Sequence, residues 1–347
     1  MGARVLVCGL ATLDVVQTVE RVPTANEKVV ATGLAVAAGG PAANAAVTCA
    51  ALGVPARLVT RIGGGALGGL VRADLVGAGV EVVDLAGPGA SPPVSTVLIT
   101  RATGERAVVS VNATGTGARA TRGEVPADVW DGVGLVLVDG HHLDLGVAVA
   151  TDARRRGVPV LLDGGSWKPG LEALLGRVDV AVVSADFTVP EGARDTSGGD
   201  VLDASGGDVR DASGGDVLDA LLRLGPSVAA RSAGGGPIEV ASATGERGSV
   251  DVPAVTVVDT LGAGDVLHGA LAAWLAVRGL TVGARAVRVP AEDAPGGEPD
   301  DVVAALAWAG GVASASCGAA GARGWAADNA LVSRLRAELG TAGPAGR

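Results

Sequence analysis

The sequence contains very few aromatic or sulfur-containing side chains. Its 347 residues include one Phe, no Tyr, one Met and five Trp, although 48% of the residues are hydrophobic and 18% are charged. The hydrophobic content comes mainly from Ala, Val and Leu, and it excludes a disordered chain. A chain of this length can bury a large core, as one α/β domain or two smaller ones.

Basic charge and closely spaced cysteines are also scarce. The chain has 27 Lys and Arg against 37 Asp and Glu, a net charge of −10, so we expect no nucleic-acid or anionic-membrane partner. Cys8, Cys49 and Cys317 lie far apart in apolar surroundings, which predicts reduced, buried thiols and a cytoplasmic protein. No apolar run approaches the roughly 20 residues that span a bilayer. The N-terminus predicts a buried strand, not a signal peptide.

Short apolar runs alternate with helical patterns along most of the chain. Repeating strand–helix units predict an α/β fold with a doubly wound, mainly parallel sheet flanked by helices. Two segments, about 14–37 and 93–112, alternate apolar and polar residues as hairpins do, and they predict a small β lid. We treat residues 1–347 as a single domain. Three Gly-Gly-Asp octads at 195–218 predict an acidic low-complexity insertion without chemistry.

The most distinctive motif is Asp259-Thr260-Leu261-Gly262-Ala263-Gly264-Asp265, a turn between a β-branched run at Val257-Val258 and a helix expected from about Asp265. Small residues let the backbone N–H groups of Gly262, Ala263 and Gly264 converge where the helix dipole is positive, which makes an anion site. Asp265 is a carboxylate in the first helical turn. An anion site beside a fixed base is what phosphoryl transfer to an alcohol requires. Because 56 residues are Gly, the turn can equally be an ordinary helix cap.

A second motif, Gly39-Gly40-Pro41-Ala42-Ala43-Asn44, opens a helix predicted from about Pro41 to Leu52. The two glycines allow close backbone approach to a ligand, and Asn44 lies one turn inside the helix, where it can point back at that ligand. Asp14 follows the first predicted strand, at the edge where open α/β sheets bind ligands. An Asp at that position can also cap a turn.

The two motifs resemble the signatures of the ribokinase-like (PfkB) carbohydrate kinases, and the resemblance covers roughly residues 4–330. It implies an ATP-dependent phosphotransferase that moves the γ-phosphoryl group to a hydroxyl of a sugar or sugar-like substrate. Asp265 would be the catalytic base and the turn 262–264 the anion hole. The acceptor would be bound by Asp14, Gly39, Gly40 and Asn44.

The resemblance also implies further contacts. Arg106 matches a lid arginine that reaches the sugar or phosphate in some relatives, although it can also be a solvated turn charge. ATP would contact Gly262, Gly264 and the helix end formed by Cys317, Gly318 and Gly321. Mg²⁺ would bridge the ATP phosphates, and Asp259 matches a position that helps bind a monovalent cation such as K⁺. A homodimer formed through the lid is a further expectation.

Three positions depart from the family pattern. Ser184-Ala185-Asp186-Phe187 stands where many members carry an Asn-x-x-Glu motif that organises Mg²⁺, so no Mg²⁺ ligands can be assigned. Gly64-Gly65 replaces acidic residues, and Ser232-Ala233-Gly234 replaces Thr-x-Gly. Two alternatives therefore stay open: a nucleoside kinase of the same family, or a catalytically impaired regulator that binds a sugar or nucleotide.

Overall fold

The computed structural model describes residues 4–87, 89–111, 125–190, 192–193, 217–279 and 302–341. Except for Val217 and Leu218, the predicted insertion 195–218 lies outside these residues. No helix within the described ranges is long and apolar enough to cross a membrane.

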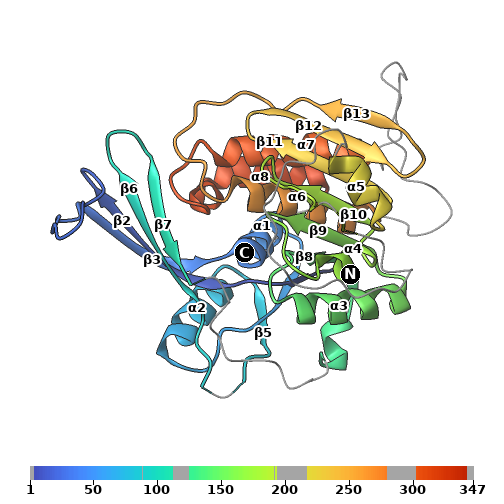
Figure 1. Ribbon diagram of the computed structural model, residues 1–347, viewed down its shortest axis with the longest axis horizontal. Coiled ribbons are helices and arrows are strands. Elements are labelled where there is room, and N and C mark those ends of the chain that lie inside the picture. The colour runs from blue at the N-terminus through green and yellow to red at the C-terminus, as the bar shows by residue number, and fades with distance from the viewer. Residues whose placement is uncertain are drawn as a thin grey trace.

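A nine-stranded sheet forms the centre of the molecule, in the order β13-β12-β11-β10-β9-β8-β1-β4-β5 (Figure 1). The strands from β5 through β11 in this order pair in parallel, and β12 and β13 are antiparallel at one edge. Central strands are apolar throughout because both of their faces are covered. The bounds are β1 Arg4–Cys8, β4 Ala56–Thr60, β5 Glu81–Asp84, β8 Val133–Val138, β9 Val160–Gly164, β10 Val180–Val183, β11 Val228–Ala233, β12 Gly236–Ser242 and β13 Arg247–Val250.

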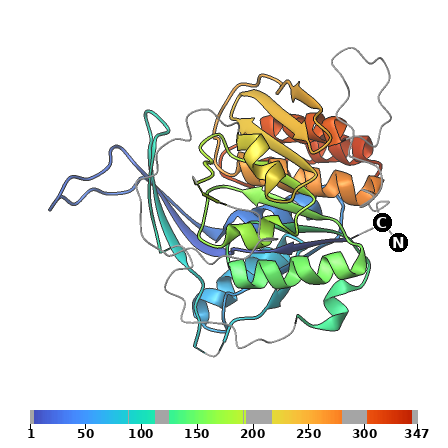
Figure 2. The ribbon, with the colours of Figure 1, turned by 45° about the vertical axis from the view of Figure 1, so that its right-hand side comes forward.

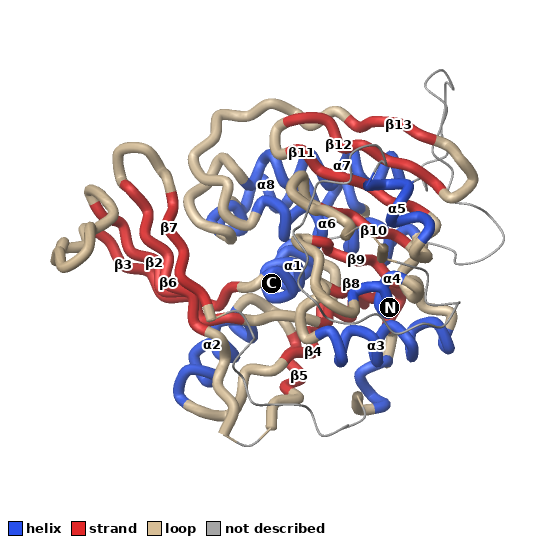
Figure 3. Tube along the Cα trace, in the orientation of Figure 1, coloured by secondary structure: helices blue, strands red, loops and turns tan. Residues whose placement is uncertain are grey.

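Helices cover both faces of this sheet (Figures 2 and 3). Alternate residues of β1 show the two layers, because Val5 and Val7 pack into one core and Leu6 and Cys8 into the other. The first core includes α1 Pro41–Ala51, α2 Ala66–Gly77, α6 Ala263–Arg278, α7 Val302–Ser316 and α8 Asn329–Leu339. The second includes α3 Leu143–Arg156, α4 Leu171–Leu175 and α5 Val217–Arg223. The predicted doubly wound α/β fold is confirmed.

A separate four-stranded sheet extends from the main body (Figures 1 and 2). Its order is β3-β2-β6-β7, with β2 Thr12–Val19, β3 Gly33–Gly39, β6 Val94–Thr100 and β7 Arg106–Ser110. The register places Asp14, Ser95 and Ser110 side by side, so Arg106, four residues before Ser110, lies on the same face as Asp14. These strands come from the two segments that the sequence predicts as a lid; movement as a lid remains a prediction.

The chain before α6 differs from the expected strand-to-helix turn. Residues 251–260 form no strand; instead the N–H groups of Val258 and Asp259 donate to the Cys317 carbonyl at 2.7 and 3.1 Å. The run lies beside the end of α7 in space, and its Val257 and Val258 side chains are 59% and 60% exposed. Helix α6 begins at Ala263, slightly before the predicted start.

Candidate active site

The chain reverses its direction of winding beside β1. From β1 it runs outward to β4 and β5, and it later returns to β8 on the other side of β1. Ligands in open α/β sheets bind at such a switch point, outside the carboxyl ends of the strands. The end of β1, the loop after β8 and the end of β9 therefore define the region in which a site is expected.

Asp139, directly after β8, connects the segments of this region through hydrogen bonds. Its side chain is 3% exposed, and its carboxylate accepts hydrogen bonds from the N–H groups of Leu10, Ala42 and His141 at 2.7, 3.2 and 2.8 Å. These bonds join the end of β1 to the first turn of α1. The sequence analysis missed Asp139, although an acid directly after a buried apolar run at the ligand edge was the available signal.

Asp14 and Gly39, both expected to bind the acceptor, lie against each other. The Thr12 hydroxyl donates to one Asp14 oxygen at 2.7 Å. The other oxygen lies so close to Gly39 that a Cβ there would stand 1.9 Å from it. Gly40 has φ +96°, and a Cβ there would lie 2.5 Å from the Leu10 carbonyl oxygen. Gly39 thus leaves room for the Asp14 carboxylate, and Gly40 is required by close approach of the backbone.

Helices α1 and α6 bring Asn44 to Asp265. The Asn44 amide Nδ2 donates to Asp265 Oδ2 at 2.7 Å, across 221 residues of sequence. One turn further along α6, a Cβ on Gly269 would lie 2.6 Å from the Ala45 carbonyl oxygen. The absence of a side chain at Gly269 thus lets the two helices approach closely enough for this bond.

Burial and a like charge perturb the Asp265 carboxyl. Desolvation first, and then the nearby Asp163, raise the pKa of Asp265 to about 7, while the Asn44 hydrogen bond and His268 oppose this rise. A carboxylate with a pKa near neutrality is well matched to act as a general base at physiological pH.

A buried pair, Asp163 and His268, lies beneath Asp265. Asp163 ends the apolar part of β9, and its Oδ2 lies 3.3 Å from His268 Nδ1, while His268 Nε2 lies 3.1 Å from the Val182 carbonyl oxygen. Desolvation and the neighbouring Asp139 raise the pKa of Asp163 well above its ordinary value. Desolvation lowers the pKa of His268. Burial therefore makes a charge on either group costly beside Asp265. Neither residue was singled out from the sequence.

Arg323 is a further residue that was not predicted from the sequence. It follows α7 in a loop, and its Nε donates to Asn44 Oδ1 at 2.9 Å while its Nη1 donates to Asp74 Oδ2 at 2.9 Å. Burial lowers the pKa of Arg323, and the carboxylates of Asp74, Asp14 and Asp265 act in the opposite direction. An arginine in a loop rich in Gly and Ala gives no periodic signal, so only the tertiary structure reveals this contact.

The predicted anion turn stands at the N-terminus of α6. Gly262 is its N-cap with φ +75°, a conformation that favours glycine. Within the described residues, the N–H groups of Gly262 and Gly264 have no hydrogen-bond acceptor, whereas that of Ala263 donates to the Thr260 carbonyl at 3.3 Å. Free N–H groups are present in the first turn of any helix, so the position of this turn beside Asp265 is what makes it a candidate anion site.

Arg106 and Asp259 lie beside this turn. Arg106 reaches from β7 and donates from Nη2 to the Thr260 hydroxyl at 2.7 Å, so it is more than a solvated charge. The two Asp259 oxygens accept from the N–H groups of Leu261 and Gly321, each at 2.9 Å. Arg106 Nη1 lies 3.9 Å from Asp259. Asp259 thus joins the turn to the loop after α7.

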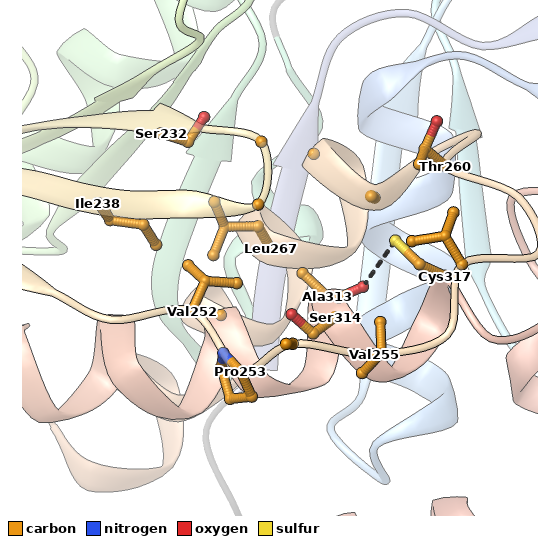
Figure 4. A pocket seen from close by; sticks show the side chains of 17 residues that line it. Ser232, Ile238, Val252, Pro253, Val255, Thr260, Leu267, Ala313, Ser314 and Cys317 are labelled. Carbon is orange, nitrogen blue, oxygen red and sulfur yellow. Dashed lines mark hydrogen bonds between the residues drawn. The ribbon is translucent and has the colours of Figure 1, made fainter.

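An apolar cavity of about 510 Å³ opens on the other side of the turn (Figure 4). Its walls are the hairpin between β11 and β12, residues 252–257, the start of α6 and the end of α7. Gly264 and Cys317 line the cavity, and the Cys317 thiol donates to the Ala313 carbonyl at 3.4 Å. Gly262, Gly318 and Gly321, also expected to contact ATP, are not among the lining residues.

The described residues contain no cluster of three or more His, Cys, Asp or Glu side chains that could hold a metal ion. Phe187, at the position of the family's metal-organising Glu, is fully buried and packs edge-on against Trp167, with ring centroids 6.1 Å apart. Asp186 beside it is exposed. Within the described ranges, the side chains at 184–187 therefore do not reproduce the family's metal-organising pair.

The sequence matches a known protein family over its N-terminal half. A family model described as pfkB family carbohydrate kinase matches residues 3–188, more than half of the 347 residues. The chain belongs to the pfkB family of carbohydrate kinases. The matched range includes Asp14, Asn44 and Asp163, whereas Asp265 and Arg323 lie beyond it.

Solved structures of this carbohydrate kinase fold match nearly the whole chain. A ribokinase from Arabidopsis thaliana, solved with ribose and ATP, is 22% identical with a TM-score of 0.70, and the match covers 97% of this chain and 99% of that one. A fructokinase from Xylella fastidiosa with bound ATP is 16% identical with a TM-score of 0.68, covering 98% and 100%. A ribokinase from Thermotoga maritima is 17% identical with a TM-score of 0.68, covering 96% and 99%. At these identities the likeness shows the fold.

Proposed function

We propose that this carbohydrate kinase transfers the γ-phosphoryl group of ATP to a hydroxyl of a sugar or sugar-like substrate. The observation that carries this proposal is the position of Asp265. It lies between the acceptor wall formed by Asp14, Gly39 and Asn44 and the N-terminal turn of α6, which borders the cavity. The relatives solved with ATP, one of them also with ribose, support the same pair of substrates.

In this mechanism Asp265 takes the proton of the attacking hydroxyl as that oxygen approaches the γ-phosphorus. Asp14 accepts a hydrogen bond from another acceptor hydroxyl and so orients the substrate. The free N–H groups of Gly262 and Gly264 stabilise charge on the transferring phosphoryl group. The leaving group is ADP, and the proton held by Asp265 passes to solvent after the product leaves.

The cavity beside α6 is proposed to hold the nucleobase of ATP. Its apolar walls suit a flat heterocycle, and Gly264 at its edge also belongs to the anion turn. Arg106, bonded to Thr260, stands where it can neutralise phosphate charge or contact the acceptor. Mg²⁺ bound to the ATP phosphates would neutralise part of their charge. K⁺ activation through Asp259 is also proposed; both of its carboxylate oxygens already accept backbone hydrogen bonds, so a cation there would share those oxygens.

The four-stranded sheet is proposed to act as a lid and as a homodimer surface. On its face opposite Asp14 the register aligns Val36 and Val109 through β2 and β6, with Leu34 on the same face. Leu34, Val36 and Val109 are 70%, 50% and 75% exposed, so this face presents apolar side chains that a second copy would cover. Sedimentation of the native protein and of Val109→Asp tests this: a dimer that becomes a monomer on substitution supports it, and a native monomer contradicts it.

The proposed reaction is tested by ATP consumption against a panel of sugars and nucleosides, with and without K⁺. Turnover that rises with a sugar and is lost in Asp265→Asn supports the proposal. Turnover with a nucleoside alone would identify the protein as a nucleoside kinase. Tight binding of a sugar or nucleotide without turnover would indicate a regulator, the alternative that the buried Phe187 favours.

A further inference from the structure

Arg323 fixes which end of the Asn44 side chain faces Asp265. A guanidinium can only donate hydrogen bonds, so its Nε, 2.9 Å from Asn44, selects the amide oxygen Oδ1 as partner. The amide nitrogen Nδ2 is then left on the other side, where it donates to Asp265 Oδ2 at 2.7 Å. Without Arg323 the amide could turn over and offer its oxygen to a protonated Asp265.

This arrangement distinguishes the two protonation states of the base. Asn44 Nδ2 can donate to a carboxylate, but it cannot accept a hydrogen bond from a protonated Asp265. Asp74 holds the guanidinium in place at 2.9 Å and also accepts from the Ala38 N–H on β3 at 2.8 Å. Asp74, itself anchored to β3, therefore fixes the guanidinium where it meets Asn44.

We propose that Arg323 is a positioning residue of the phosphoryl-transfer centre, which acts through the Asn44 amide to present an N–H group to Asp265. The proposal rests on the proposed function, because it takes Asp265 as the base.

The loop that carries Arg323 also touches the anion turn. The Gly321 N–H donates to Asp259 at 2.9 Å. Ala322 packs against Gly262 so closely that a Cβ on Gly262 would lie 2.6 Å from the Ala322 Cβ. One short loop thus sets both the orientation of the amide beside the base and the position of the phosphate-binding turn.

The charged and titratable groups around Asp265 come from several elements. They are Asp163 at the end of β9, Asp139 after β8, His268 on α6 and Arg323 in the loop after α7. Asp163 and Asp139 raise the pKa of Asp265, and the Asn44 hydrogen bond and His268 lower it. Loss of Arg323 removes a positive charge and releases the Asn44 amide, and both changes favour the protonated form of Asp265.

The test measures the pKa of Asp265 directly in the full-length protein and requires no turnover of substrate. The Asp265 carboxyl is followed by ¹³C NMR of protein labelled at aspartate, and its signal is assigned by its absence from Asp265→Asn. In Arg323→Met we expect the pKa of Asp265 to rise by about one pH unit. Arg334→Met is the matched control, because this exposed arginine on α8 pairs with Glu338 at 3.7 Å, and it should leave the pKa unchanged.

A double-mutant cycle with Asn44→Ala separates action through the amide from charge alone. If Arg323 acts through Asn44, Arg323→Met shifts the pKa much less in the Asn44→Ala background than in the native one. An equal shift in both backgrounds, or no shift in folded Arg323→Met, would overturn the proposal. If Arg323→Met does not fold, Arg323→Lys carries the same test, since one ammonium group lacks the planar fork that spans Asn44 and Asp74.

A kinetic measurement completes the test. With a substrate from the panel, we expect the acid limb of kcat/KM for the acceptor to move upward by the same interval in Arg323→Met, with the KM for ATP within about twofold of native. An unmoved limb would contradict the proposal. If no compound is phosphorylated, the proposed function fails, and the NMR titration still decides the role of Arg323.

Discussion

Asn44 and Asp265 share a hydrogen bond of 2.7 Å although 221 residues separate them in the chain. The bond joins the N-terminal glycine motif to the C-terminal one, and it is made possible by the close contact of α1 and α6 at Gly269. Because each residue lies in the first turns of its helix, the helix pair fixes the position of the proposed base relative to the glycine motif proposed to bind the acceptor.

Replacement of Asp265 by Asn should abolish most of the turnover. The amide keeps the size of the side chain but cannot take a proton, so we expect kcat to fall about 10²- to 10⁴-fold. Steady-state kinetics with the identified acceptor measure the loss, and circular dichroism confirms that the variant is folded. Full kcat in a folded Asp265→Asn would show that another group is the base.

The reaction should depend on one ionisation near neutrality. Asp265 must be a carboxylate to accept a proton, and burial together with Asp163 raises its pKa to about 7. We therefore expect kcat/KM to fall about tenfold per pH unit below pH 7 and to level off above it. A pH profile of kcat/KM for the native protein measures this fall on the acid side.

Asp163→Asn should shift the acid limb of the kcat/KM profile to lower pH, whereas Arg323→Met should shift it to higher pH. The substitution removes a carboxylate whose charge raises the pKa of Asp265, so the acid limb should shift to lower pH. The comparison is made between the pH profiles of the two variants. A limb that stays in place in Asp163→Asn would mean that the like charge does not set the pKa.

Gly39→Ala should weaken the acceptor site alone. An added Cβ would lie 1.9 Å from an Asp14 oxygen and force that carboxylate to move. We expect the KM for the acceptor to rise at least about tenfold, with the KM for ATP within about twofold of native. Gly65→Ala is the control, because a Cβ there meets nothing within 4 Å. Equal changes in both KM values would argue against separate sites.

Ala313→Leu should weaken ATP binding and leave acceptor binding unchanged. Ala313 lines the apolar cavity, so the larger side chain would fill space proposed for the nucleobase. The KM for ATP should rise about tenfold or more, since the lost space excludes part of the heterocycle, and acceptor binding should be unchanged. Ala307→Leu, on an exposed position of the same helix, is the matched control. Unchanged ATP affinity in Ala313→Leu would remove the cavity from the proposed mechanism.

Gly269→Ala should lower stability as well as activity. Its Cβ would lie 2.6 Å from the Ala45 carbonyl oxygen and 2.7 Å from the Thr48 Cβ, so α1 and α6 must separate. Overpacking of this kind costs about 1–3 kcal/mol of the free energy of unfolding. Chemical denaturation measures it, with Gly311→Ala as control, because a Cβ at Gly311 in α7 meets nothing within 4 Å. A control less stable than Gly269→Ala would contradict the packing argument.

Much of the fold was predictable because its signals are local. Buried strands such as Arg4–Cys8 are continuous apolar runs, and the glycines at 39, 40 and 262 stand where close contact or a positive φ excludes a side chain. The run before Gly262 misled the sequence analysis. Val257 and Val258 have strand propensity, but the N–H groups of Val258 and Asp259 donate to the Cys317 carbonyl just after α7, and the run joins no sheet.

The sequence by itself determined the alternating α/β architecture, the two glycine motifs and the identity of Asp265 as the candidate base. Only the tertiary structure decided how that base is controlled. The contacts of Asp139, Asp163, His268 and Arg323 join residues far apart in the chain, and no spacing in the sequence records them. The pKa of Asp265 likewise depends on desolvation and on charges from other strands and loops, which exist only once the chain has folded around it.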